Sequence, residues 1–384
     1  MTGEDKVRKK KRRLLGIAFS FVSIATLIYI TITLISGRTS GLTKLTGLFS
    51  ARTPAGMADE YHFDVGRGRV FADLGSHLAA AGTLGVQVLD ESGTETLRDP
   101  FLMSSPALSV TDEYAIAFDI GGAAVRVFDD SRILSSIEAS GAVVSATINR
   151  NGWFCLCTQE SGAFKSFVTV YDNKGREVYK ISLASGYALS SLLSSDNRRL
   201  AVLCLTDEGS RVTLYDINNE SYDSEYIYPN GLIIDISYLP NGELLAVAAD
   251  SLILIDKDGA DSEFYGFSGR RLGGYSIGSS FITLHLLDYN VSHHGRLITL
   301  SDGGKLLGEL ETDREIISIS SDSRYLAILQ SDGLVLFDEE LSELPPIEGL
   351  AATVGATQVV ALGNGAALAA GEHSAVVYRA TQNP

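Results

Sequence analysis

The chain has 384 residues, of which 45% are hydrophobic and 20% are charged, and its formal net charge is −16 at pH 7. This length suits one large domain or two ordinary ones, and the hydrophobic fraction is sufficient for a large core. Because nucleic-acid binding needs a basic surface, so acidic a chain argues against nucleic acid as a partner.

The N-terminal segment predicts a membrane anchor. Residues 1–13 form a basic tail with seven Lys or Arg and two acidic side chains, and Leu14–Ser36 follows without a charge. These 23 residues would span about 34 Å as a helix, enough to cross a hydrocarbon core of about 30 Å. The apolar region of a cleaved signal peptide is shorter, normally about 7–15 residues. We therefore expect one uncleaved transmembrane helix.

The basic tail also predicts the orientation of the chain. Positive residues beside a span stay in the cytoplasm, so we expect a single-pass cell-membrane protein with a cytoplasmic N-terminus and the rest outside. The tail carries +5, which leaves −21 on the residues that follow it. We expect residues 37–60 to be a juxtamembrane linker and residues 61–384 to be the ectodomain.

A repeat of 37–45 residues runs through the ectodomain. Each copy contains an alternating apolar strand that ends at an equivalent position, which is an Asp in six copies. Self-similarity at such a period is typical of repeat architectures. The eight end positions are Asp90, Asp129, Asp172, Asp216, Asp256, Ser301, Asp338 and Arg379.

The strand pattern around these positions predicts the fold class. Upstream, a strand leads through a polar turn into a very apolar strand, as in residues 233–250, and downstream a fourth strand follows, as in Arg176–Leu183. Four short antiparallel strands in each repeat are typical of a β-propeller blade. We predict an all-β fold with eight four-stranded blades, with seven as the alternative. Residues 60–65 are expected to add the missing outer strand of the last blade and close the ring.

The segment Ser166–Ile181 carries a family likeness. Its order of apolar strand, Asp172, turn ending in Gly175 and apolar strand resembles the repeat of quinoprotein-like (PQQ-like) propellers, and also that of WD40 and outer-membrane assembly-factor propellers. The whole chain is similar to a family of membrane-anchored propeller proteins of Gram-positive bacteria whose function is unknown. The resemblance implies a shape and no catalytic residue. Tyr179 stands where the quinoprotein repeat usually carries Trp, and Trp153 is the only tryptophan.

Most residues that could carry chemistry have simpler explanations. Asp256–Glu263 resembles part of a calcium loop, but its glycine falls at the fourth position instead of the sixth, which favours a hairpin turn. Each strand-end Asp is expected to accept hydrogen bonds from the amides of its own turn. His293 and His294 are adjacent and lack a third ligand nearby. The other histidines are scattered over four repeats: His62, His77, His285 and His373.

Two further motifs also favour structural roles. Gly269–Ser280 is rich in glycine but opens no helix, so it lacks the helix N-terminus that binds phosphate. Cys155, Cys157 and Cys204 are expected to be buried free thiols rather than a disulfide framework. We therefore predict no catalytic, cofactor-binding or metal-binding residue, and no cofactor.

Three functions are compatible with these predictions. A protein–protein interaction platform at the cell envelope is favoured, because an anchored propeller without catalytic motifs offers two faces of loops to envelope proteins. A sensor or binder of a wall glycan or small ligand is the first alternative. A propeller enzyme, either a dehydrogenase or a hydrolase, is the second, and it predicts carboxylates and histidines clustered at one mouth of a central channel.

Overall fold

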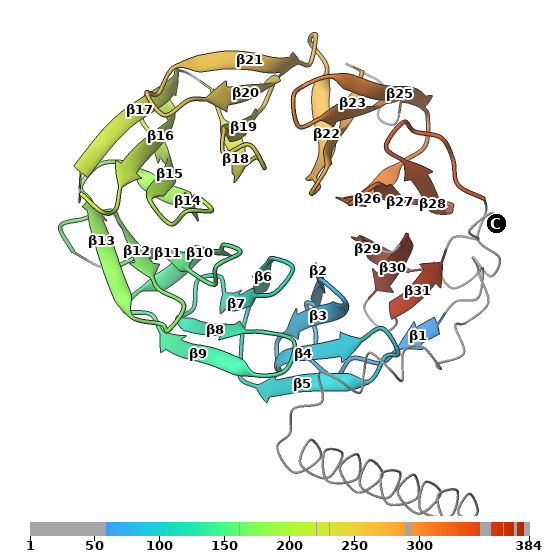
Figure 1. The fold of residues 1–384 in the computed structure, drawn as a ribbon, viewed down its shortest axis with the longest axis horizontal. Coiled ribbons are helices and arrows are strands. Elements are labelled where there is room, and N and C mark those ends of the chain that lie inside the picture. Colours follow the sequence, from blue (N-terminus) through green and yellow to red (C-terminus); the bar gives the residue numbers. More distant parts are fainter. Residues whose placement is uncertain are drawn as a thin grey trace, which may run out of the picture. The chain divides into compact units, whose positions relative to one another are not determined.

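The structure is a computed structural model that describes residues 59–160, 162–219, 221–229, 231–288, 294–345, 355–363, 365–371 and 375–379. The predicted tail, the anchor at residues 14–36 and nearly all of the linker lie outside these residues. No helix in the described ranges is long and apolar enough to span a membrane. The described strands form eight sheets arranged in a ring (Figure 1).

Blades 1 to 4 come from the first half of the ring. Blade 1 contains β2 (Val70–Leu74), β3 (His77–Gly82), β4 (Gly85–Asp90) and β5 (Glu95–Pro100). Blade 2 contains β6 (Pro106–Val110), β7 (Ala115–Asp119), β8 (Ala124–Phe128) and β9 (Ile133–Glu138). Blade 3 contains β10 (Ala142–Ile148), β11 (Phe154–Gln159), β12 (Ser166–Tyr171) and β13 (Glu177–Leu183). Blade 4 contains β14 (Tyr187–Leu193), β15 (Arg199–Thr206), β16 (Gly209–Asp216) and β17 (Ser221–Pro229).

Blades 5 to 8 complete the ring. Blade 5 contains β18 (Ile233–Tyr238), β19 (Leu244–Ala248), β20 (Ser251–Ile255) and β21 (Asp261–Gly266). Blade 6 contains β22 (Arg271–Ile277), β23 (Phe281–Leu287), β24 (Gly295–Ser301) and β25 (Leu306–Thr312). Blade 7 contains β26 (Ile316–Asp322), β27 (Tyr325–Gln330) and β28 (Gly333–Asp338). Blade 8 contains β29 (Ala356–Leu362), β30 (Ala366–Gly371), β31 (Ala375–Arg379) and β1 (Asp59–Tyr61).

The two ends of the ring meet in blade 8, where Figure 1 shows β1 beside β31. The two strands are antiparallel, with Asp59 opposite Val377 and Tyr61 opposite Ala375. The prediction that the segment before the first repeat supplies the outer strand of the last blade is therefore confirmed, although this strand is Asp59–Tyr61 and not the predicted residues 60–65. Eight sheets also exclude the seven-blade alternative.

Blade 7 departs from the predicted four strands within the described residues. After β28 the chain turns back, Glu343 forms a single bridge with Phe337, and the Leu344 N–H donates to the Leu336 carbonyl at 2.8 Å. The next two residues are Pro345 and Pro346. Proline has no backbone N–H, so these two residues cannot donate to a sheet ladder.

The core lies between the blades. Eight clusters of buried apolar residues are present in the described residues, one for each pair of neighbouring blades. Strand β15 shows why: Leu200 and Val202 pack toward blade 3, whereas Ala201 and Leu203 pack toward blade 5. Successive side chains of a strand point to opposite faces of the sheet. A continuously apolar second strand therefore holds a blade to both neighbours.

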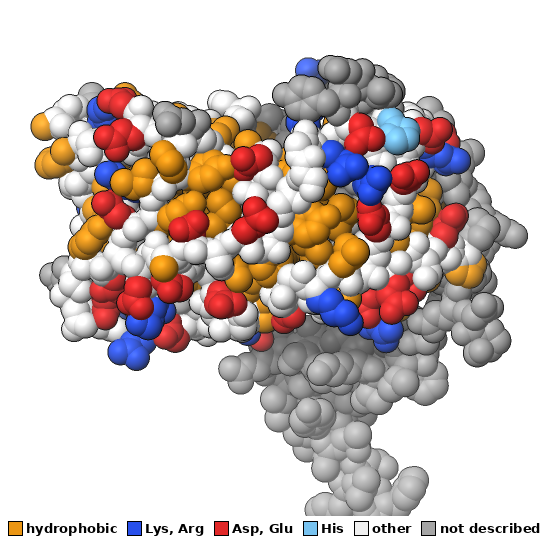
Figure 2. All heavy atoms as spheres, turned by 90° about the horizontal axis from the view of Figure 1, so that it is seen from above, with side chains coloured by type: hydrophobic (Ala, Val, Ile, Leu, Met, Phe, Trp, Pro, Cys, Tyr) orange, Lys and Arg blue, Asp and Glu red, His pale blue; other side chains and the backbone are white. Residues whose placement is uncertain are grey.

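The antiparallel order gives the ring two distinct faces. The first and third strands of each blade end on one side, which we call the turn face, and the second and fourth strands end on the other, the loop face. The first strands lie nearest the centre of the ring (Figure 1). Figure 2 shows the outer wall, where hydrophobic side chains are interspersed with acidic ones.

Candidate functional site

The recurring aspartates form turns on the turn face. Asp172 Oδ1 accepts hydrogen bonds from the N–H groups of Lys174 and Arg176 at 2.9 and 3.0 Å, and its Oδ2 accepts one from Arg176 Nε at 2.7 Å. These bonds hold the pKa of Asp172 below its usual range against the effect of burial, which raises it. The other five aspartates also accept two amides of their own turns, which confirms the predicted role: Asp90, Asp129, Asp216, Asp256 and Asp338.

The sequence-predicted calcium-like segment is a hairpin turn between β20 and β21. Asp256 Oδ1 accepts the N–H groups of Asp258 and Ala260 at 2.8 and 2.9 Å, and Glu263 lies in β21 opposite Ile253. Gly269–Ser280 contains the innermost strand of blade 6 instead of a phosphate loop. In the described ranges, no group of three or more His, Cys, Asp or Glu residues is placed to hold a metal ion.

The histidines lie in separate environments. His62 is exposed, and His294 Nδ1 lies 2.8 Å from Asp288 Oδ2 in blade 6. His285 is buried within β23, and burial lowers its pKa to about 4. His77 lies on the turn face between blades 1 and 2, with Nδ1 3.8 Å from Asp130 Oδ2. His293 and His373 are outside the described residues.

The three cysteines are free and buried, as expected. All three belong to the apolar cluster between blades 3 and 4, and Cys157 Sγ lies 3.2 Å from Ser191 Oγ. Burial raises the pKa of each thiol. Tyr179 and Trp153 pack against the same cluster, so Tyr179 contributes to the interface between blades 3 and 4.

Carboxylates gather near the centre of the turn face. Asp73 is near the end of β2, Asp322 ends β26, and Asp112 follows β6. Burial, followed by the negative charges of Asp322 and Asp112, raises the pKa of Asp73 to about 7, although the Gly363 N–H donates to its Oδ2 at 3.4 Å. A shifted carboxyl group of this kind marks a candidate functional position.

An acidic recess lies on the same face between blades 1 and 2. Its volume is about 280 Å³. The lining includes His77, so in this recess one of the scattered histidines lies together with carboxylates. The recess is lined by Leu74, Ser76, His77, Asp112, Glu113, Tyr114, Asp129 and Asp130.

Six of the eight described innermost strands have a β-bulge near the loop face. In β10, β14, β18, β22, β26 and β29 the pairing register skips one residue at the equivalent place. The skipped residues Ile234 and Ile317 are 45% and 46% exposed. Bulges re-aim side chains, and here they present aliphatic groups near the centre of the loop face.

Large apolar side chains are concentrated on the loop face. Of the fourteen exposed ones among the described residues, nine lie in the loop-face connections or within the two residues of a strand nearest that face. We call these nine the loop-face patch. They are Leu84, Leu102, Ile120, Phe164, Tyr187, Leu205, Leu232, Ile234 and Ile317.

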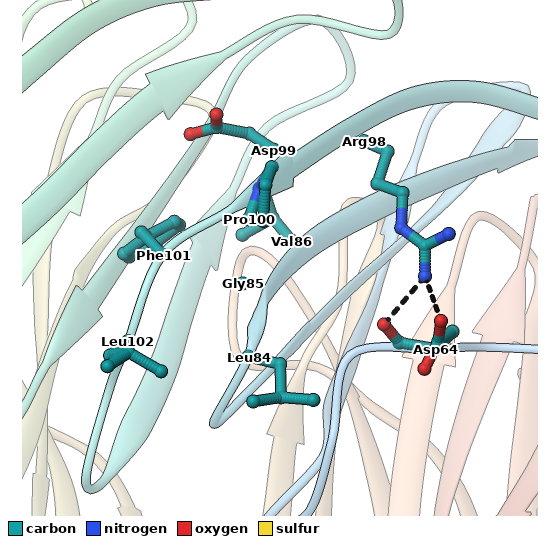
Figure 3. A pocket seen from close by; sticks show the side chains of 9 residues that line it. All are labelled: Asp64, Leu84, Gly85, Val86, Arg98, Asp99, Pro100, Phe101 and Leu102. Carbon is teal, nitrogen blue, oxygen red and sulfur yellow. Dashed lines mark hydrogen bonds and ion pairs between the residues drawn. The ribbon is translucent and has the colours of Figure 1, made fainter.

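Part of the loop-face patch surrounds a pocket in blade 1 (Figure 3). The pocket has a volume of about 430 Å³ and lies between β4, β5 and the connection that follows β5. Arg98 pairs with Asp64 at one side of it, and Asp99 accepts from Arg126 Nε at 3.1 Å. The lining residues are Asp64, Leu84, Gly85, Val86, Arg98, Asp99, Pro100, Phe101 and Leu102.

Sequence reasoning missed both the patch and the pocket. Their residues lie in connections that do not repeat, so the period that revealed the blades carries no information about them. The available signal was the presence of Leu84, Leu102, Ile120 and Leu232 in segments between predicted strands, where polar turn residues are usual.

Two solved structures show the same kind of fold. The C-terminal WD40 domain of Sif2 is 13% identical with a TM-score of 0.58, and the match covers 85% of this chain and 99% of that chain. BamB from Moraxella catarrhalis is also 13% identical with a TM-score of 0.50, and the match covers 84% of this chain and 100% of that chain. Likeness at this identity supports the propeller fold alone.

Sequence comparison identifies a protein family that matches the chain. No curated protein matches the chain. The profile of a family of unknown function, DUF5711, matches residues 55–340, which covers most of the ring and includes the repeats with their strand-end aspartates. The chain therefore belongs to the DUF5711 family.

Proposed function

We propose that this protein is a membrane-anchored interaction platform whose loop face binds a partner protein at the outer side of the cell membrane. The observation that carries the proposal is the concentration of exposed apolar side chains on one face of a rigid ring. Apolar patches of this kind on soluble surfaces mark sites of interaction.

The path of the chain supports the choice of face. Asp59, the first residue of β1, lies opposite Val377, close to the turn-face end of β31. The predicted tether from Leu14–Ser36 would therefore join the ring at its turn face. The loop face lies on the opposite side of the ring from this attachment point, where an envelope partner can reach it.

Crosslinking in native membranes tests the platform. The double variant Ile234→Ser and Ile317→Ser removes two exposed aliphatic groups from the loop face, and we expect it to lower the yield of crosslinked envelope protein several-fold. The matched control, Val178→Ser and Leu306→Ser, removes exposed aliphatic groups from the outer strands β13 and β25. Equal yields from the two double variants would contradict the proposal.

A binder of a wall glycan or small ligand is the second candidate, and the acidic recess favours it. The recess combines His77, Asp112 and Asp130 with the aromatic wall of Tyr114. A thermal-shift titration with soluble wall fragments tests this function. A shift that is unchanged in the Asp112→Asn and Asp130→Asn double variant would remove the recess as the binding site.

A further inference from the structure

We propose that the pocket beside Leu84 and Leu102 receives a large apolar side chain from an acidic segment of a partner protein. This inference rests on the proposed platform function and assigns it a site and a partner chemistry. The pocket volume of about 430 Å³ lies within the range of small binding sites, about 300–1,000 Å³. Its carbon-rich wall is formed by Leu84, Val86, Phe101 and Leu102.

The rim of the pocket is both exposed and held in place. Leu102 is 77% exposed and Leu84 is 50% exposed. The backbone around them is fixed, because the Leu84 N–H donates to Val65 O at 2.8 Å and the Phe101 N–H donates to Leu84 O at 3.2 Å. An apolar rim that is already ordered loses little conformational entropy on binding. The arrangement is therefore suited to an inserted anchor side chain.

The apolar surface continues beyond the pocket. The Ile120 N–H donates to Ser105 O at 2.9 Å, so exposed Ile120 lies against the connection that carries Leu102. A small ligand confined to the pocket would leave Ile120 and most of Leu102 in water. A polypeptide can cover the pocket and this extension together, so we commit to a protein partner.

The pocket's own carboxylates are neutralised. Arg98 pairs with Asp64, and Arg126 pairs with Asp99 while its guanidinium lies 4.5 Å from the centre of the Phe101 ring. A buried neighbour, Asp119, accepts the N–H groups of Ser104 and Ser105 at 2.7 and 2.6 Å. The negative groups around the pocket are thus engaged by arginines or by backbone amides.

Two further arginines belong to the chain segment that lies next to Leu84. The Arg67 N–H donates to Thr83 Oγ1 at 3.0 Å, next to Leu84, and Arg69 Nε donates to Gly66 O at 2.9 Å. Neither Arg67 nor Arg69 has an ion-pair partner within the described part of the chain. In a protein of net charge −16, this local excess of arginine favours a partner segment rich in Asp and Glu.

Site-specific photocrosslinking in intact cells tests the inference with the full-length protein. A benzophenone amino acid replaces Leu102, and control proteins carry it at Ile317 or Leu306. We expect crosslinking at position 102, and mass spectrometry should identify a partner segment that contains a large apolar residue and more acidic than basic side chains. A basic or entirely polar segment would overturn the inference.

Charge-reversal variants provide a second test of the inference. Arg67→Glu with Arg69→Glu should lower the crosslinking yield at position 102 by about tenfold, whereas Arg150→Glu with Lys174→Glu on the turn face should leave it unchanged. Thermal melting of each variant verifies folding. If position 317 captures a partner but position 102 does not, the inference fails and the platform stands. If none of the loop-face positions captures a protein, the platform itself fails.

Discussion

Asp172 and Gly175 show how one turn is specified at the scale of single residues. Asp172 accepts two backbone amides, and the Gly175 N–H closes the turn by donating to the Asp172 carbonyl at 2.9 Å. Gly175 has φ +72°, a backbone conformation that other residues adopt only with strain. A Cβ at this position would also lie 2.3 Å from Ser135 Oγ on the neighbouring blade.

We therefore expect Gly175→Ala to lower the free energy of unfolding by about 1–3 kcal/mol, through backbone strain and the contact with Ser135. Gly121→Ala is the control, because Gly121 has φ +81° but a Cβ at that position would meet no atom within 4 Å. Urea denaturation of both variants separates the two effects. If both variants lose the same free energy of unfolding, the Ser135 side chain moves away from the new Cβ without cost.

The raised pKa of Asp73 determines how the stability of the folded protein should change with pH. Its pKa is raised to about 7, chiefly by burial and then by the charge of Asp322, so the folded protein retains a proton that the unfolded chain loses near pH 4. The protonated carboxyl group therefore contributes its full stabilisation of the folded state below about pH 4, and this contribution is lost as the pH rises through 7. Asp73→Asn mimics the protonated carboxyl group, so its stability advantage over the parent should grow with pH.

We expect this advantage to increase by about 3–4 kcal/mol between pH 4 and pH 8, because the pKa rises by about three units, each worth about 1.4 kcal/mol. Denaturation at the two pH values measures it. Asp258→Asn serves as the control for removal of an exposed carboxylate, one that pairs with Lys257. An advantage of Asp73→Asn that is the same at both pH values would contradict the raised pKa.

At the scale of strands, a side-chain amide of blade 8 pairs with the backbone of blade 1. Gln358 Oε1 accepts the Phe71 N–H at 3.2 Å, and its Nε2 donates to the Phe71 carbonyl at 2.9 Å. Gln358 is on β29 and Phe71 is on β2, 287 residues apart in the chain. The amide therefore links the first and last inner strands across the closure of the ring.

Gln358→Met keeps the size of the side chain but leaves both Phe71 groups without this partner. We expect it to lower the free energy of unfolding by about 1–3 kcal/mol, because two partly buried hydrogen bonds, each worth about 0.5–1.5 kcal/mol, are lost. Thr357→Val, at the exposed neighbouring bulge, provides the control. If urea denaturation shows a lower free energy of unfolding for Gln358→Met alone, the result supports the link. Unchanged stability of this variant would show that water replaces the Gln358 amide as the partner of Phe71.

At the scale of the whole molecule, the ring has two chemically different faces. The turn face carries the strand-end aspartates and the carboxylates around Asp73, and the loop face carries the exposed apolar side chains. Asp59, the first residue of β1, lies opposite Val377 near the turn-face end of β31.

The predicted membrane attachment through Leu14–Ser36 can be tested by fractionation. The full chain should remain in the membrane fraction after alkaline carbonate extraction, and a variant that lacks residues 1–36 should become extractable, because a helix of this length is held by burial in the hydrocarbon core. Protease added outside intact protoplasts should degrade the ring. Protection of the ring from external protease would reverse the predicted orientation.

The sequence by itself determined the all-β propeller, its eight repeats and the role of the aspartates. It could do so because blades are local: an alternating strand such as Ser166–Tyr171 and a turn such as Asp172–Arg176 are specified by neighbours in the chain and recur at a fixed spacing. Even the closure by residues near Glu60 followed from the missing outer strand of the last repeat.

Only the tertiary structure decided where the distinctive surfaces lie. The Asp73 carboxylate accepts the Gly363 N–H, 290 residues away in the chain. Leu102, Leu84 and Arg67 lie in connections that do not repeat, and hydrogen bonds between these connections bring them together. Exposure of an apolar side chain depends on which connections pack beside it, and the pKa of Asp73 depends on charges from other blades. The repeat specifies the scaffold, whereas packing between neighbouring blades and their connections creates the candidate sites.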